Sequence, residues 1–214
     1  MKIKISSCLL ILVAVTPLAQ TLSAEGLLGK KYFEIVYKTG NLTNSFSDGD
    51  IDVWGVNTRL NIPLANEDET VSYDAFISLS HAEIDDSTID GDGQEIDLGI
   101  VFYNSNSKFQ DIEFKPFLAL SGGYADGTIF EYSDKSFIYT ATAGIEFPID
   151  NFITITPYFR YVNIVELEDG DDTIAGIDFN FWITKRSNIG INWEQVSNSG
   201  STLDVYGFAF RIGF

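Results

Sequence analysis

The last ten residues, Val205-Tyr206-Gly207-Phe208-Ala209-Phe210-Arg211-Ile212-Gly213-Phe214, place a large apolar side chain at every second position. In an extended strand, successive side chains point to opposite faces. One face therefore carries aromatic and aliphatic side chains, and the other carries small residues and Arg211. This alternation predicts a strand with one apolar face, which points inward in a soluble sandwich and outward in a wall that meets lipid.

This ending resembles the C-terminal strand of bacterial outer-membrane β-barrels, whose closing aromatic residue is read by the insertion machinery. The resemblance implies a C-terminal insertion signal formed by Tyr206, Phe208, Phe210, Ile212 and Phe214. It also implies that the chain meets periplasmic chaperones and the barrel-assembly machinery on its way to the membrane.

The N-terminus carries the pattern of a secretory signal peptide. Lys2 and Lys4 precede an apolar run that ends before Leu22-Ser23-Ala24, a small-residue cleavage site. The run is too short and wrongly flanked for a membrane-spanning helix. We therefore expect residues 1–24 to be removed on export and residues 25–214 to form one outer-membrane barrel domain. Cys8 is the one cysteine and lies in the leader, so no disulfide is expected after cleavage.

The composition limits the partners. The leader holds two of the 13 basic residues and none of the 31 acidic ones, so the remaining chain has 11 basic residues and a formal charge of −20. This charge disfavours nucleic acid or anionic lipid headgroups as partners. Aromatic residues make up 14% of the chain, which favours folded strands over disorder.

Ten segments show the two-residue alternation over about the nine to eleven residues that a tilted strand needs to cross a bilayer. They are Lys31–Thr39, Asp52–Ile62, Val71–Ala82, Glu95–Tyr103, Phe114–Tyr124, Ser136–Phe147, Phe152–Asn163, Thr173–Ile183, Ile189–Gln195 and Thr202–Phe214. We expect an all-β, antiparallel, up-and-down transmembrane barrel of ten strands, with eight and twelve as alternatives. An even number places both termini on the periplasmic side. Pro116 and Pro157 fall within strands and predict irregular pairing nearby.

The two faces of these strands differ in character. One is almost wholly apolar, whereas the other is small, polar or charged. The charged positions on the second face are Glu34, Lys38, Arg59, Asp74, Glu95, Asp97, Lys115, Glu146, Arg160, Asp178, Glu194 and Arg211. A soluble barrel keeps its apolar face inside and cannot bury this many charges as well. The apolar face is therefore predicted to meet lipid and the charged face to line a lumen.

Connections after even-numbered strands are short or compact, whereas those after odd-numbered strands are longer on average and acidic or polar. Because barrels of this kind keep their periplasmic turns short, we expect the acidic loops outside the cell. Asp85–Glu95 and Glu166–Asp172 offer the oxygen ligands and glycines that calcium favours, but not the spacing of a full binding loop. We expect no cofactor and no tight metal site, with weak Ca²⁺ or Mg²⁺ binding at these loops as the alternative.

The one histidine, His81, belongs to the apolar face near the external end. It is either a catalytic base paired with Asp85 or Asp86, or a polar residue at the level of the lipid headgroups. We favour the second interpretation and expect no enzymatic activity.

The lumen has two interpretations. A barrel of eight to ten strands is only slightly wider inside than its side chains can fill, which favours a plug of ion pairs. Arg211 is expected near partners such as Glu34 and Glu146. The alternative is a narrow, weakly cation-preferring pore for small solutes, since seven carboxylates on the charged face outnumber five basic groups.

Over its whole length after the leader, the chain resembles the small OmpA/OmpX-type outer-membrane β-barrel superfamily. The features that carry this resemblance are the leader, the alternation of side chains and the ending from Tyr206 to Phe214. The resemblance implies an integral, porin-like protein of the Gram-negative cell envelope with surface loops. Its expected partners are outer-membrane lipids and lipopolysaccharide, and we expect a monomer. We expect a structural or surface-interaction protein, with the pore as the alternative.

Overall fold

The computed structural model describes residues 26–43, 51–64, 71–85, 90–105, 107–110, 112–129, 132–165, 171–198 and 201–214. The predicted signal peptide, residues 1–24, lies outside the described residues, as do 86–89 and 166–170 of the acidic loops. The described residues contain no helix that is long and apolar enough to cross a membrane.

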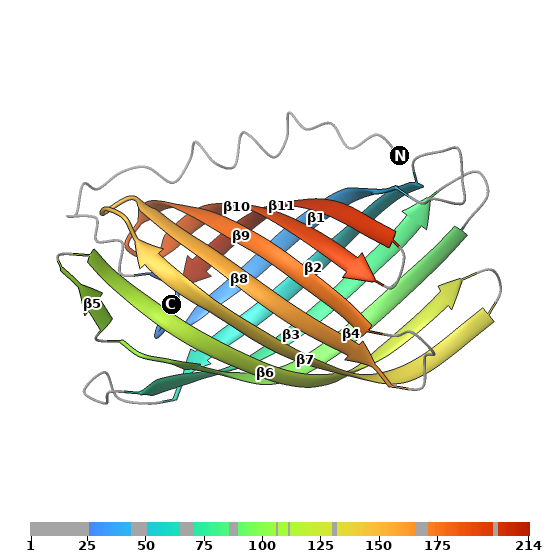
Figure 1. Cartoon of the computed structure of the whole chain (residues 1–214), viewed down its shortest axis with the longest axis horizontal. Coiled ribbons are helices and arrows are strands. Elements are labelled where there is room, and N and C mark those ends of the chain that lie inside the picture. The colour runs from blue at the N-terminus through green and yellow to red at the C-terminus, as the bar shows by residue number, and fades with distance from the viewer. Residues whose placement is uncertain are drawn as a thin grey trace.

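The described chain is built of strands. They are β1 (Tyr32–Thr43), β2 (Ile51–Pro63), β3 (Ser72–Asp85), β4 (Asp90–Tyr103), β5 (Ser107–Phe109), β6 (Ile112–Ile129), β7 (Tyr132–Pro148), β8 (Ile153–Ile164), β9 (Asp171–Thr184), β10 (Ser187–Asn198) and β11 (Ser201–Gly213). Neighbouring strands are antiparallel, β1 pairs with β11, and β4 pairs with β6. These pairings close ten tilted strands into a barrel, and the prediction of a ten-stranded all-β barrel is confirmed (Figure 1).

The seam between the first and last strands follows from the alternation of both. Ile35 lies opposite Phe210 and Glu34 lies opposite Arg211, so apolar positions face apolar positions and charged positions face charged ones. A shift of one residue would turn the apolar side chains of one strand toward the lumen. The first and last strands therefore pair in a single register. We call the end of the barrel where β1 begins and β11 ends, with Tyr32 opposite Gly213, its terminal end.

Several strand limits differ from those expected. β6 runs to Ile129 and β7 begins at Tyr132, so most of the expected loop between residues 125 and 135 is paired strand. Backbone ladder bonds do not require apolar side chains, so the hairpin continues after the apolar alternation ends. The three-residue β5 was not expected, and it pairs with the start of β6 at the terminal end (Figure 1).

The two strand prolines behave differently. Pairing between β7 and β8 is interrupted beside Pro157, between the pairs Gly144–Tyr158 and Phe147–Ile155, without a change of register. Proline offers no N–H to the ladder, which explains the gap. Pro116 lies opposite Ile145 in a continuous ladder with β7, so the irregularity expected there is absent from this pairing.

The outer surface of the barrel is apolar. Leu98 is 63% exposed and Phe137 is 68% exposed, and many other large apolar side chains point outward beside them. The inward positions instead bury polar groups, including Asn61, Asn180 and Thr154. A continuous apolar surface around a polar interior is the arrangement of a barrel surrounded by lipid.

Candidate functional site

The terminal end of the lumen is crossed by residues 26–31, which we call the closing segment. The Leu27 amide donates to Glu146 Oε2 on β7 at 2.6 Å, and the Gly29 amide donates to Asp74 Oδ2 on β3 at 2.9 Å. Asn61 Nδ2 on β2 donates to the Lys30 carbonyl at 2.9 Å. These bonds tie the segment to strands on separate parts of the wall, so it lies across the opening.

Two glycines allow the closing segment to approach the wall this closely. Gly26 and Gly29 have φ values of 78° and 85°, a region that residues with a side chain rarely adopt. A Cβ at Gly26 would collide with the Glu146 carboxylate, and one at Gly29 would lie 2.9 Å from the Tyr103 hydroxyl oxygen. Both positions therefore require glycine for conformation and for space.

Buried carboxylates anchor the closing segment. Asp74 has no exposed surface, and it also accepts hydrogen bonds from Asn61 at 2.8 Å and from the Tyr103 hydroxyl at 3.2 Å. Glu146 is 2% exposed, and Lys115 Nζ lies 4.0 Å from its Oε1. A buried carboxylate is tolerated only with such partners, so each anchor depends on the groups around it.

Beside this anchor, Arg211 forms a second buried cluster. Its Nε pairs with Glu34, and its Nη1 donates to Asn180 and, at 3.2 Å, to Asn188. Arg211 therefore has the expected partner Glu34. It does not have Glu146, which contacts Leu27 and Lys115 instead.

A third cluster lies further from the terminal end. Glu194 on β10 is paired with Lys38 Nζ at 2.7 Å and with Arg160 Nη1 at 3.7 Å, and it accepts the Tyr158 hydroxyl at 2.5 Å. These partners come from β1 and β8, whereas Glu194 itself lies on β10. One carboxylate thus links strands on different parts of the lumen wall.

The remaining predicted lumen residues are less tightly held. The Arg59 guanidinium lies 3.9 Å from the Phe76 ring centroid, and Glu95 accepts from Ser80 at 3.5 Å. Asp97 and Asp178 also point inward. A cavity of about 620 Å³ runs among the clusters and is lined by ten of the twelve predicted lumen residues. The other two, Asp74 and Lys115, bond to the closing segment instead.

The residues of the expected insertion signal lie on the outer surface of β11 and at the chain end. Tyr206, Phe208, Ile212 and Phe214 are exposed, and Phe210 is half-buried. Their role in insertion stays a prediction, since the geometry reports only their position.

His81 also faces outward. Its Nε2 lies 3.1 Å from Glu83 Oε1, and its ring meets Trp54 edge to face at 6.0 Å. The carboxylate beside it is thus Glu83, whereas the expected partners Asp85, through its side chain, and Asp86 lie outside what the structure describes.

Charge away from the lumen is exposed. Lys108 and Glu113 form a 2.6 Å ion pair beside β5, and this hydrogen bond raises the pKa of Lys108. Exposed pairs of this kind contribute little to stability. Within the described ranges there is no group of three residues suited to hold a metal, and the acidic loops fall partly outside these ranges.

Sequence reasoning missed the closing segment and the aromatic residues that support it. Tyr103 and Trp182 have the inward parity of their strands and are buried, and Trp182 Nε1 donates to Thr154 Oγ1 at 3.0 Å. Gly26 and Gly29, placed between the leader and the first strand, were the available signal for a tight, non-strand segment.

No protein-family model and no curated protein matches the chain. Among solved structures, the β-domain of the Bordetella autotransporter BrkA superposes with a TM-score of 0.55 and 10% identity, over 86% of this chain and 100% of that one. The translocator domain of the autotransporter NalP from Neisseria meningitidis gives 0.49 and 7%, over 88% and 90%. Ail of Yersinia pestis gives 0.37 and 12%, over 88% and 100%. Identities this low bear on the fold alone, which is of the outer-membrane β-barrel class.

Proposed function

We propose that this chain, with the fold of the outer-membrane β-barrels, is an integral outer-membrane protein of the structural or surface-interaction kind, with a lumen plugged by ion pairs and by its own closing segment. The observation that carries the proposal is the closing segment, held across the terminal end by Glu146, Asp74 and Asn61. No catalytic group is needed for this role, and none is assigned.

The buried clusters support a plug over an open channel. Ion pairs join strands of the wall across the lumen, namely Glu34 with Arg211, and Glu194 with Lys38 and Arg160. A charged group inside the barrel is stabilised by such a partner, because leaving it unpaired costs free energy. Each cluster occupies space that a permeating ion would need. We place the acidic loops outside the cell, where they offer a charged surface to cations or to partner proteins.

Planar-bilayer recording on the purified, refolded protein tests the plug. We expect small or rare openings, because the closing segment and the ion pairs obstruct the lumen. Large, steady conductance from the unmodified protein would contradict the plug and favour the pore.

The pore remains the second candidate because one observation favours it. The cavity of about 620 Å³ is lined by the carboxylates of Glu95, Asp97 and Asp178, among others. Rings of carboxylates attract cations in channels. If the recording shows steady current, a preference for K⁺ over Cl⁻ is the expected selectivity.

A further inference from the structure

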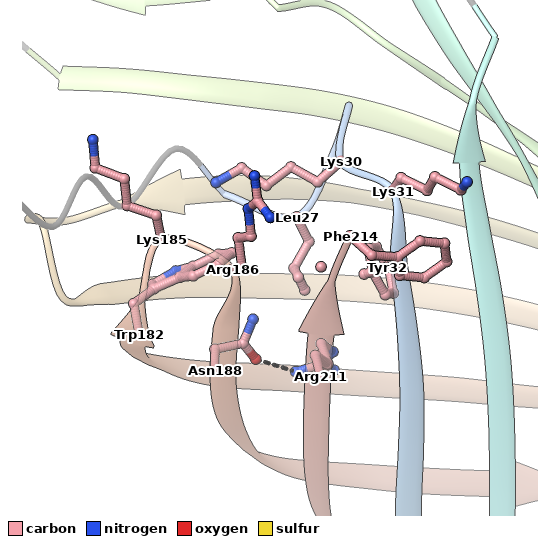
Figure 2. Close-up of a pocket in the computed structure, with 11 residues that line it drawn as sticks. Leu27, Lys30, Lys31, Tyr32, Trp182, Lys185, Arg186, Asn188, Arg211 and Phe214 are labelled. Carbon is pink, nitrogen blue, oxygen red and sulfur yellow. Dashed lines mark hydrogen bonds between the residues drawn. The ribbon is translucent and has the colours of Figure 1, made fainter. Parts of the chain in front are cut away.

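Four basic residues surround a small pocket at the terminal end, and a fifth, Arg211, lies in its floor. The pocket has a volume of about 190 Å³, and Lys30, Lys31, Lys185 and Arg186 are among the residues that line it (Figure 2). We call it the basic pocket. Lys185 and Arg186 form the turn between β9 and β10, and the two lysines precede β1. The hairpin turn and the residues before β1 thus bring four of the 11 basic residues of the predicted mature chain to one place.

Three of these four cations, Lys31, Lys185 and Arg186, differ from most other basic residues of the described barrel in their surroundings. Among the described residues, no carboxylate forms an ion pair with Lys31, Lys185 or Arg186, whereas Lys38, Lys115, Lys135, Arg160 and Arg211 are each paired. No aspartate or glutamate is among the described residues that line the pocket. An excess of positive charge is unexpected in a chain with 31 acidic residues.

The basic pocket lies where the apolar outer surface ends. Lys31 Nζ is 4.5 Å from the Phe214 ring centroid, and Phe214 is 60% exposed. Lys30 Nζ lies 4.3 Å from the ring centroid of the buried Trp182. Figure 2 shows Lys30 and Arg186 above Asn188 and Arg211, which form the floor. The Lys31 ammonium, on the exposed Phe214 ring, therefore lies at the edge of the apolar surface, where lipid headgroups begin, and Lys30 lies on the lumen side of the same pocket.

We propose that the basic pocket binds the phosphate of an anionic phospholipid from the leaflet that meets the terminal end. Lys30, Lys185 and Arg186 would surround the phosphate, since guanidinium and ammonium groups are its usual ligands. Lys31 would contribute from the outer face, and the acyl chains would lie along the apolar wall beside Ile212 and Phe214. This inference rests on the membrane placement in the proposed function.

The test is a lipid titration of the refolded full-length barrel in detergent, followed by native mass spectrometry. The ligands are phosphatidylglycerol, the zwitterionic phosphatidylcholine and inorganic phosphate. One double variant carries Lys185→Gln and Arg186→Gln, and a second carries Lys31→Gln and Lys185→Gln. The matched control carries Lys108→Gln and Lys135→Gln, which removes two exposed cations outside the pocket.

We expect both pocket variants to bind phosphatidylglycerol about 25-fold more weakly than the unmodified protein, because each cation near an anionic lipid surface contributes roughly fivefold. The control should match the unmodified protein, and phosphatidylcholine should bind less well than phosphatidylglycerol. Equal binding by the pocket variants and the control would overturn the proposal. Displacement of the lipid by inorganic phosphate at comparable concentration would overturn the lipid assignment.

A gel shift between unheated and boiled samples separates this result from a failure of the proposed function. All four proteins should show the shift of a folded barrel, because the substituted side chains are exposed or at the pocket rim. A folded, membrane-inserted protein without lipid preference refutes the basic pocket alone. A protein that does not insert into lipid at all refutes the proposed function.

Discussion

Replacing Arg211 with alanine should destabilise the barrel by about 3–5 kcal/mol, which is the range for removing one partner of a buried ion pair. Glu34 is 7% exposed and would be left without its cation, and Asn180 and Asn188 would each lose a donor. Arg211 also lies in the last strand, opposite Glu34 in the first, so the lost contact weakens the seam that closes the barrel. Urea unfolding of the protein in lipid vesicles measures the change.

Two variants control this prediction. Lys135→Ala removes one member of an exposed pair with Asp126, and its cost should stay within about 1 kcal/mol. The double variant Glu34→Gln with Arg211→Ala removes the uncompensated charge and should recover part of the loss. If Arg211→Ala costs no more than Lys135→Ala, the cluster does not hold the seam.

Replacing Glu146 with alanine should open the terminal end. The Leu27 amide would lose its acceptor, and Lys115 would lose its buried carboxylate. The closing segment would then be held by Asp74, Asn61 and the bond from Lys115 to the Leu28 carbonyl. A hydrogen bond to a charged group contributes about 1.5–3 kcal/mol, which corresponds to roughly a 10- to 140-fold shift toward the open state. Single-channel recording should show an open probability that rises by the same factor, through longer or more frequent openings.

Glu113→Ala is the matched control, because it removes an exposed carboxylate at the same end of the barrel. It should leave the recordings unchanged. A heat-dependent gel shift of Glu146→Ala must remain, to show that the wall is intact. An intact Glu146→Ala barrel with the conductance of the unmodified protein would mean that the closing segment does not gate the lumen.

Much of the wall could be predicted from the sequence, because the alternation of side chains carries the information. A tilted strand beside lipid needs an apolar residue at every second position, so Phe208 and Leu98 reveal their face directly. The same parity places Glu34, Lys38 and Arg211 in the lumen. The strand count followed from the number of alternating segments, and the closed topology bears it out.

The partners inside the lumen could not be predicted in the same way. Parity gives the face of a residue but not its height, which depends on the stagger between strands. Glu146 was therefore expected near Arg211, although it lies on β7 and bonds to Leu27. The closing segment has no alternation, and its course depends on contacts with residues far away along the chain. The same holds for the basic pocket, which combines a turn with the chain start.

The limits of the longest hairpin, β6 and β7, could not be predicted from the sequence for a related reason. β6 and β7 pair to Ile129 and Tyr132, beyond the last apolar alternation. Backbone hydrogen bonds hold these residues together whatever their side chains, so a pattern of hydrophobicity carries no signal for them.

Cell fractionation with a heat-modifiable gel shift tests the central claim, an integral outer-membrane barrel, most directly. The full chain is expressed in a Gram-negative host, the membranes are separated, and samples are run with and without boiling. We expect the protein in the outer-membrane fraction, with the unboiled sample migrating apart from the boiled one because the barrel remains folded in detergent. A chain recovered as a soluble periplasmic protein, with no difference between the two samples, would contradict the account.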